Sequence, residues 1–396
     1  MEQTAASHSE PNPGAIAPGL SLYLELLRLL AATEVVLFHV NGFALLGGQR
    51  AAWNAFGHEA VVVFFVLSGF VIAFAAQTRE HTAKAYAVSR LTRIYSVALP
   101  CLLFTLLFDR IGQALAPQLY AGLITDGSAL VRLVLGGLFL NESWSVSAQM
   151  FSNTPYWSIA YEFWYYAVFA ALFYFRGWAR ITLTALAGLI AGYKILLLFP
   201  IWALGWGVYR WTRSHQVSPA LGVVLFVQPA LVLYLDDSLS WTRHAGEWLA
   251  AMIGQDTWRV GLSWSRYVLT DTLLGLSMAV HFVGAAALSP WLERALLPLA
   301  KPVKWLAARS FTLYLLHQPA MLLVGAVLLT LGLPLLGSWS VFAATWGIVL
   351  VVAQVSELQK HRLKPLVVWL LDWPERALAR RRNAIPALWR ARQQHD

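Results

Sequence analysis

The chain has 396 residues, of which 58% are hydrophobic and only 12% are charged, and its mean hydropathy is +0.58. These values exclude a soluble globular domain and indicate an all-α, polytopic integral membrane protein. The formal net charge of +9 is spread over the connections between apolar runs, so we expect no nucleic-acid partner. The single cysteine, Cys101, excludes an intrachain disulfide and a multi-cysteine metal site, and we expect no metal.

Three regions are predicted along the chain. The polar residues 1–19 lack the basic segment of a cleaved signal peptide and are expected to form a short disordered tail. A transmembrane domain of about ten helices is expected over residues 20–356, and a basic cytoplasmic tail over residues 357–396. The boundary between the fifth and sixth runs is ambiguous around 194–200, where the two runs could form a broken pair. The apolar runs that are long enough, or nearly long enough, to span a bilayer are 20–40, 60–77, 94–112, 156–175, 181–199, 200–211, 219–236, 266–288, 310–331 and 339–356.

The distribution of basic residues predicts which side each connection occupies. If the N-terminus is cytoplasmic, the cytoplasmic connections carry twelve Lys and Arg residues, and the outer connections carry six although they are longer. This asymmetry places both termini in the cytoplasm, with the basic C-terminal tail lying on anionic lipid. Two outer connections, 113–155 and 237–265, are too long for simple turns and are expected to lie over a mouth on the outer face.

The first apolar run carries ionisable side chains that are costly inside a membrane. Arg28 and His39 are eleven residues apart, which returns them to within about 20° of one helix face at a separation of ~16 Å. Glu25, three residues before Arg28, joins this face. The alignment of a carboxylate, a guanidinium and an imidazole predicts that this helix forms the wall of a reaction or transport path.

Arg90 and Arg93 share a face at the start of the third run. One interpretation is that they are membrane anchors on the cytoplasmic side. The other is that they bind phosphate groups, because guanidinium groups contact phosphate oxygens in a bidentate way. The spacing leaves both interpretations open.

The fourth run places Glu162 about 8 Å inside the outer boundary, at a depth similar to that of His39. Trp157 and Ser158 lie one turn from Glu162 on the same side of the helix. A carboxylate and an imidazole at matching depth can form a proton-transfer pair. A structural hydrogen bond between helices is an equal alternative.

Polar residues in two further runs are interpreted mainly as packing residues. Ser68 is followed by Gly69, which favours close helix approach, and the sequence offers no adjacent base to activate Ser68 as a nucleophile. Tyr314 and His317 lie on one face of the ninth run, where Pro319 predicts a kink. A lone intramembrane histidine is usually a packing residue, so this role is expected for His317.

Five motifs in a fixed order resemble the acyltransferase family 3 membrane proteins, which O-acylate surface polysaccharides and some secreted small molecules. The resemblance extends from residue 20 to about 356. The motifs are Glu25-x-x-Arg28-x-x-Ala31-x-x-x-Val35-x-x-x-His39, FFVLSGF at 64–70, Arg90-x-x-Arg93-Ile94, Asn153-x-Pro155-x-Trp157-Ser158-x-x-x-Glu162, and Ser310-Phe311-x-x-Tyr314-Leu315-x-His317-x-Pro319.

The resemblance implies a ten-span fold with both termini inside and an acyl-CoA donor. The essential histidine of the family corresponds to His39 and its first-helix arginine to Arg28. Its paired arginines correspond to Arg90 and Arg93, and its Trp-Ser and acidic positions to Trp157, Ser158 and Glu162. The chain departs from the family pattern at Glu25, where Asp is commoner, and at Ala60-Val61-Val62, where Gly-Val-Asp is common.

The sequence therefore predicts a membrane O-acyltransferase of the bacterial cytoplasmic membrane. Acyl-CoA, with acetyl-CoA expected, is the co-substrate, and the acceptor is a hydroxyl of a carbohydrate or another compound. His39 and Glu162 are the predicted catalytic residues, and Arg28, Arg90 and Arg93 are predicted to bind the donor. Glu25, Ser68, Trp157, Ser158, Tyr314 and His317 are expected to support the site. The alternative is a proton-coupled transporter that uses the same buried charges. Acceptor identity, acyl chain length and oligomeric state stay open.

Overall fold

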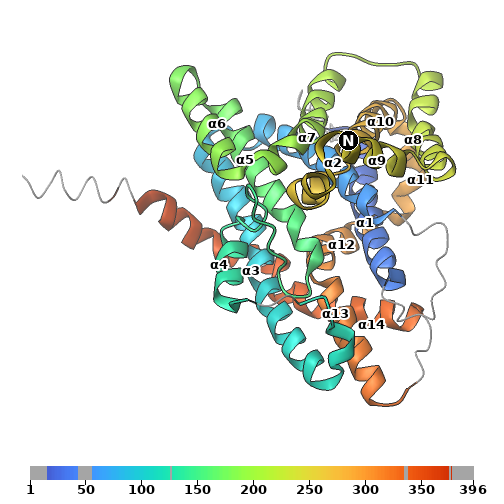
Figure 1. Ribbon diagram of the computed structural model, residues 1–396. Coiled ribbons are helices and arrows are strands. Elements are labelled where there is room, and N and C mark those ends of the chain that lie inside the picture. Colours follow the sequence, from blue (N-terminus) through green and yellow to red (C-terminus); the bar gives the residue numbers. More distant parts are fainter. Residues whose placement is uncertain (1–15, 43–55, 125–126, 334–337, 374–375, 377–396) are drawn as a thin grey trace, which may run out of the picture.

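The computed structural model describes residues 16–42, 56–124, 127–333, 338–373 and 376 (Figure 1). The predicted N-terminal tail and the tip of the connection after the first helix therefore lie largely outside the described residues. Within the described part the chain is helical and has no strand, apart from one isolated bridge between Met150 and Asn153. The all-α fold class is confirmed.

Fourteen α-helices of differing length lie between Pro18 and Val355 in the described part of the chain. They are α1 (Pro18–Gly42), α2 (Gly57–Thr78), α3 (Ala83–Leu115), α4 (Ala129–Gly137), α5 (Trp157–Tyr174), α6 (Gly177–Ala191), α7 (Tyr193–Thr212), α8 (Pro219–Leu239), α9 (Trp241–Ile253), α10 (Val268–Ala287), α11 (Ser289–Leu296), α12 (Ala300–Ala307), α13 (Ser310–Thr330) and α14 (Ser338–Val355). Beyond α14 the chain continues through a 3-10 turn, Glu357–Gln359, into helix over 360–373. The predicted cytoplasmic tail therefore begins as a helix.

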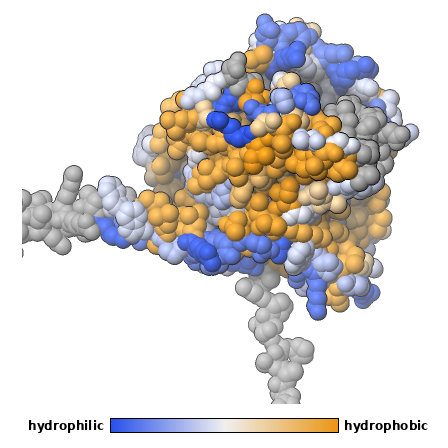
Figure 2. Space-filling view, turned by 90° about the horizontal axis from the view of Figure 1, so that it is seen from below, coloured by the Kyte–Doolittle hydropathy of each residue, from blue (hydrophilic) through white to orange (hydrophobic). Residues whose placement is uncertain are grey.

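Among the described residues, six helices are long and apolar enough to cross a membrane. They are Gly57–Thr78, Ala83–Leu115, Pro219–Leu239, Val268–Ala287, Ser310–Thr330 and the continuous stretch Trp339–Trp373. Figure 2 shows a broad hydrophobic surface with hydrophilic patches along its edges, as expected for a protein embedded in lipid. The chain is a multi-pass membrane protein, while the count of ten spans and the sidedness of the termini stay predictions.

The predicted boundary between the fifth and sixth runs is wrong. The sequence left it open over residues 194–200, but Pro200 lies inside α7, and the break between α6 and α7 falls earlier, at Gly192. Gly192 has a φ of +84°, a conformation that glycine adopts without steric cost. The proline is accommodated because a single missing N–H can be compensated within a membrane helix.

Two glycines allow α2 and α7 to pack closely. A Cβ atom at Gly69 would lie 1.9 Å from the carbonyl oxygen of Trp202, and a Cβ atom at Gly205 would lie 1.9 Å from that of Val66. The two backbones therefore touch at this crossing, as small residues permit in membrane bundles. The predicted packing role of the Ser68-Gly69 pair is confirmed for Gly69.

Helices α2 and α5 run in the same direction, which defines two ends of the bundle. At their first residues, the ring of His58 stacks on Trp157 with 6.2 Å between centroids. Beyond their last turns, the Tyr174 hydroxyl donates a hydrogen bond to the backbone carbonyl of Glu80. We call the Trp157 side the tryptophan end and the Glu80 side the arginine end, because Arg79, Arg90 and Arg93 lie there.

Helix α1 is held at the arginine end by backbone and side-chain contacts with distant segments. The Leu20 N–H donates to Ser289 Oγ at 3.0 Å, and Arg28 Nη2 donates to the carbonyl oxygen of Ala307 at 3.0 Å. Helix α1 also packs against α2, α11, α12 and α13. The predicted wall helix is thus surrounded by protein along much of its length.

Candidate active site

A cavity of about 270 Å³ lies among α1, α2, α3, α5 and α13. It reaches the protein surface at the exposed Arg79 and extends toward the tryptophan end as far as Ser158 and Tyr314. Eight of the predicted site residues line it, and they come from all five helices. These are Glu25, Arg28, Ser68, Arg90, Arg93, Ser158, Glu162 and Tyr314.

The two predicted donor-binding arginines of α3 have different surroundings. Arg90 is buried, forms an ion pair with Glu80, and donates a hydrogen bond from Nη2 to Ser89 Oγ at 2.8 Å. Arg93 lines the same cavity and forms no ion pair with the described residues. A buried ion pair resists separation, because removing one partner leaves an uncompensated charge. Arg93 is therefore the better placed of the two to meet an anionic ligand.

Helix α1 contributes polar atoms that lack protein partners. Glu25 Oε2 and Arg28 Nε are both buried and have no hydrogen-bond partner among the described residues, and both side chains line the cavity. Buried polar groups are normally hydrogen-bonded, so orphaned atoms in a cavity wall indicate that a ligand or water completes them. This arrangement fits a polar ligand beside α1.

Glu162 belongs to a hydrogen-bonded cluster that joins three helices. Its Oε1 atom accepts a hydrogen bond from Ser68 Oγ at 2.9 Å and another from the Tyr166 hydroxyl. Ser68 Oγ in turn accepts from Trp202 Nε1 at 3.1 Å. The expectation that Ser68 has no adjacent base is wrong, because the packing of α2 on α5 brings the Glu162 carboxylate to its hydroxyl.

His39 of α1 and His317 of α13 form a pair of contacting imidazole rings. His39 Nδ1 lies 3.3 Å from His317 Nε2, and the two ring centroids are 5.0 Å apart. His317 is fully buried, and its ring lies 6.4 Å from that of Tyr314. Tyr314 shares a 2.6 Å hydrogen bond with Ser158, so a short chain of contacts connects the cavity wall to the histidine pair.

Carbonyl contacts determine the tautomer of both neutral histidines. His39 Nδ1 lies 2.8 Å from the Val35 carbonyl oxygen, and His317 Nδ1 lies 2.8 Å from that of Tyr314. A carbonyl oxygen only accepts, so each Nδ1 carries the hydrogen. His39 Nδ1–H is then shared between Val35 and His317 Nε2, and the lone pair of His39 lies on Nε2.

The expected pairing of His39 with Glu162 is replaced by two separate arrangements. His39 lies against His317 because α1 packs on α13, whereas Glu162 lies against Ser68 because α5 faces α2. The matching depth predicted from the sequence carries no information about which helices are neighbours. The packing role expected for His317 is incomplete, since its ring also touches His39.

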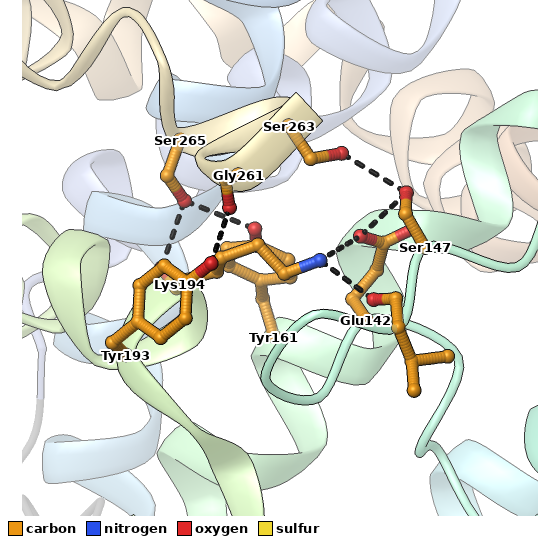
Figure 3. A network of polar contacts seen from close by, with 9 residues as sticks. Glu142, Ser147, Tyr161, Tyr193, Lys194, Gly261, Ser263 and Ser265 are labelled. Carbon is orange, nitrogen blue, oxygen red and sulfur yellow. Dashed lines mark hydrogen bonds and ion pairs between the residues drawn. The ribbon is translucent and has the colours of Figure 1, made fainter. Parts of the chain in front are cut away.

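A second polar cluster lies at the tryptophan end, where the two long connections meet (Figure 3). Lys194 is fully buried and donates to Glu142 Oε2 at 3.3 Å and to the Val146 carbonyl at 2.6 Å. Ser147 contacts both Glu142 and Ser263, at 3.1 and 3.0 Å. The connections predicted to lie over a mouth therefore cover this end of the bundle together.

The Glu142 carboxyl is outside the helices that span the membrane. Burial raises its pKa to about 7, and the Lys194 ammonium opposes this increase. Sequence analysis identified neither residue. Lys194 was noted only as part of an ambiguous boundary, and nothing in the spacing of residues 142 and 194 connects them.

The fold and the cavity define a helical membrane protein in which acidic, basic and imidazole groups surround one buried path. The family model described as an acyltransferase domain matches residues 21–356, and the chain belongs to this acyltransferase family 3. It is also 29% identical over 150 residues to the acyltransferase MdmB of Streptomyces mycarofaciens, an alignment that covers 36% of each chain. No solved structure matches.

Proposed function

We propose that the protein is an O-acyltransferase that moves an acyl group, with acetyl expected, from acyl-CoA to a hydroxyl of a carbohydrate or similar acceptor. The observation that supports this most strongly is the continuous cavity from Arg93 to Ser158 and Tyr314, with the His39–His317 pair behind it. A phosphate-bearing donor with a long, thin arm matches a cavity that has arginines at its open end and extends between the helices to Ser158 and Tyr314.

Arg93 is the proposed contact for the donor phosphates, and Arg28 and Glu25 are proposed to contact the arm of the donor. Arg90 is proposed to fasten α3 to the connection that follows α2, through its ion pair with Glu80. Arg28 Nε and Glu25 Oε2 supply a donor and an acceptor for amide groups of that arm. Both assignments rest on the orphaned atoms of the cavity wall.

His39 is the proposed general base. Its Nε2 lone pair accepts the proton of the acceptor hydroxyl while the hydroxyl oxygen attacks the thioester carbonyl carbon. The C–S bond then breaks, the acyl group stays on the acceptor oxygen, and the CoA thiolate takes the proton from the His39 imidazolium. His317 Nε2 stabilises that imidazolium by accepting from His39 Nδ1–H, which makes His317 a positioning residue.

Glu162 is proposed to stabilise the imidazolium from across the cavity, with Ser68 and Tyr166 fixing its carboxylate. Direct transfer is favoured over a Ser68 ester, since Ser68 Oγ already bridges Trp202 and Glu162. The arginine end is proposed to face the cytoplasm of a bacterium, where acyl-CoA is made, and the tryptophan end to face outward.

Donor binding tests this function directly. Arg93→Ala removes a charge-assisted contact of order 1.5–3 kcal/mol, so the affinity for acetyl-CoA is expected to fall about 10- to 150-fold. Arg93→Lys is expected to recover only part of the loss, because an ammonium group cannot make a forked contact. The measurement is calorimetric titration of the detergent-purified protein with acetyl-CoA, followed by mass spectrometry of acetylated acceptors.

Arg176→Ala is the matched control. Arg176 is exposed and is predicted to lie on the same side of the membrane, but it does not line the cavity. Its loss should leave donor affinity unchanged. Equal affinities for the wild type and the Arg93→Ala variant would remove the donor-binding role and favour a transporter that uses the same buried charges.

A further inference from the structure

A second cavity, of about 200 Å³, lies at the tryptophan end and is separate from the donor cavity. The connection before α5 and the connection before α10 both contribute to it. Its walls include the side chains of Glu142, Gln149, Thr154, Trp157, Trp264 and Arg266. It is therefore built by the same two long connections that form the polar cluster of Figure 3.

A stack of aromatic rings borders this cavity, and because Trp264 and His58 both stack on Trp157, the indole face available to a ligand is that of Trp264. Trp157 and Trp264 are stacked, with 4.9 Å between their centroids and 5° between their planes. His58 stacks on Trp157 and is itself hydrogen-bonded to Asp271 at 2.9 Å, which fixes the stack at one end. A fixed aromatic wall binds the C–H face of a ring with little loss of conformational entropy.

The remaining walls offer hydrogen bonds of both kinds. Gln149 and Thr154 provide amide and hydroxyl groups, and Glu142 provides a carboxylate. Arg266 Nε is buried and has no hydrogen-bond partner among the described residues, although the guanidinium lies over Tyr267 at 4.9 Å. An unpaired buried donor in a cavity wall indicates that a ligand atom completes it.

The charges of this cavity favour a neutral ligand. The Glu142 carboxylate is compensated by Lys194, and the cationic Arg266 faces aromatic rings. A neutral polyhydroxylated ring matches a site with one aromatic wall and alternating donors and acceptors, because each of its hydroxyls can donate and accept.

A short path leads from this cavity to the histidine pair. Thr154 Oγ1 accepts a hydrogen bond from Gln318 Nε2 at 3.1 Å, and Gln318 directly follows His317. The consecutive residues Trp157 and Ser158 line the second cavity and the donor cavity, respectively. A hydrogen bond thus joins the second cavity to the residue next to the histidine pair, and the second cavity and the donor cavity meet at Trp157 and Ser158.

From this arrangement we infer that the second cavity is the acceptor site and that it binds a pyranose ring against the open face of Trp264, which Trp157 supports from behind. This inference rests on the proposed acyl transfer and names the class of acceptor and the residues that select it. A hydroxyl of the bound ring at the Thr154 side of the cavity lies toward His39, where its proton is removed.

Hydrogen-exchange mass spectrometry of the full chain in detergent tests binding without requiring turnover. The probes are methyl α- and β-pyranosides of neutral hexoses at millimolar concentration. At least one of them is expected to slow exchange in peptides covering 142–154 and 261–266. Trp264→Ala is expected to remove this protection, and Gln149→Ala to weaken it, while Trp291→Ala, which loses an exposed indole elsewhere, keeps it.

Transfer kinetics give the second readout. For an accepted pyranoside, Trp264→Ala is expected to raise the acceptor KM about tenfold or more and to leave acetyl-CoA affinity unchanged. Protection without any transfer would overturn the acyltransferase proposal and retain the sugar site. If transfer occurs and its acceptor KM is unaffected by Trp264→Ala and Gln149→Ala, the enzyme activity stands and the sugar site is overturned. Protection that is confined to other peptides, or absent with every probe, also overturns the sugar site.

Discussion

At the scale of single residues, the histidine pair gives the clearest division of roles. His39 Nε2 carries the lone pair because Nδ1–H is engaged by Val35 and His317. His317 is itself oriented by the Tyr314 carbonyl. The base and the residue that orients it therefore come from the first and the thirteenth helix, and each can be altered separately.

His39→Ala is expected to lower kcat by about 10²- to 10⁴-fold, as is usual when a general base is lost. His317→Gln keeps a hydrogen-bonding side chain and is expected to lose less activity than His317→Ala, with KM for the donor unchanged in both. His215→Ala serves as the control, since His215 is exposed and near the end of α7. Full activity in His39→Ala, with normal protein levels in the membrane, would contradict the assignment of the base.

Glu142 gives a prediction about pH. Its pKa in the folded protein is about 7, above the ordinary 4.5, because burial outweighs the attraction of Lys194. The folded state therefore retains a proton there that the unfolded chain releases. The associated stabilisation is complete below pH 4.5 and is lost as the pH rises through 7. Lys194 and Arg266 are the charged groups that face this carboxyl or share its cavity.

The apparent Tm of the wild type in detergent should consequently fall between pH 5 and pH 8 relative to that of Glu142→Gln, which cannot titrate. Over this pH range, the difference in unfolding free energy between the two proteins should change by a few kcal/mol at most, because one pKa unit is worth about 1.4 kcal/mol. The quantity to compare is the slope of Tm with pH. The absolute Tm values also differ because the substitution removes the charged partner of Lys194. Parallel Tm curves for the two proteins would show that Glu142 does not titrate in this range.

At the scale of helices, the crossing of α2 and α7 depends on the absence of side chains at Gly69 and Gly205. Gly205→Ala would place a methyl group against the Val66 carbonyl and push the helices apart. It would also disturb the hydrogen bond between Ser68 of α2 and Trp202 of α7. We expect a destabilisation of about 1–3 kcal/mol or more, together with reduced activity.

Gly207→Ala is a control on the same helix, because a Cβ atom at Gly207 meets nothing within 4 Å. Thermal denaturation followed by size-exclusion fluorescence compares the two variants with the wild type. If Gly205→Ala proves as stable as Gly207→Ala, the crossing is looser than the backbone contact indicates.

The sequence predicted contacts within a helix better than contacts between helices. Regular spacing correctly placed Glu25 with Arg28, and Ser158 with Glu162, along one cavity. It could not predict that Ser68 meets Glu162, that Arg90 is paired with Glu80, or that His39 meets His317. Helical periodicity determines the face on which a side chain lies, but the neighbour of that face depends on the packing of the whole bundle.

At the scale of the whole molecule, the donor cavity opens at the arginine end, and the second cavity lies at the tryptophan end of α2 and α5. The sidedness predicted from basic residues therefore becomes a statement about where each substrate enters. In a Cys101→Ala background, a cysteine at the exposed position Ser145 should react with an impermeant maleimide added to intact cells. A cysteine at the exposed position His81 should react only after the cells are opened. The reverse pattern would invert the orientation and the entry side of both substrates.

The separation of the two histidines in the sequence also has a consequence for the synthesis and membrane insertion of the protein. His39 and His317 are 278 positions apart, and Arg28 bonds to a carbonyl 279 positions away. Helix α1 is synthesised and inserted long before α13 exists. A nascent or truncated chain that lacks α13 therefore has no histidine pair, and we expect it to show no acyl transfer until almost all of the chain has been inserted.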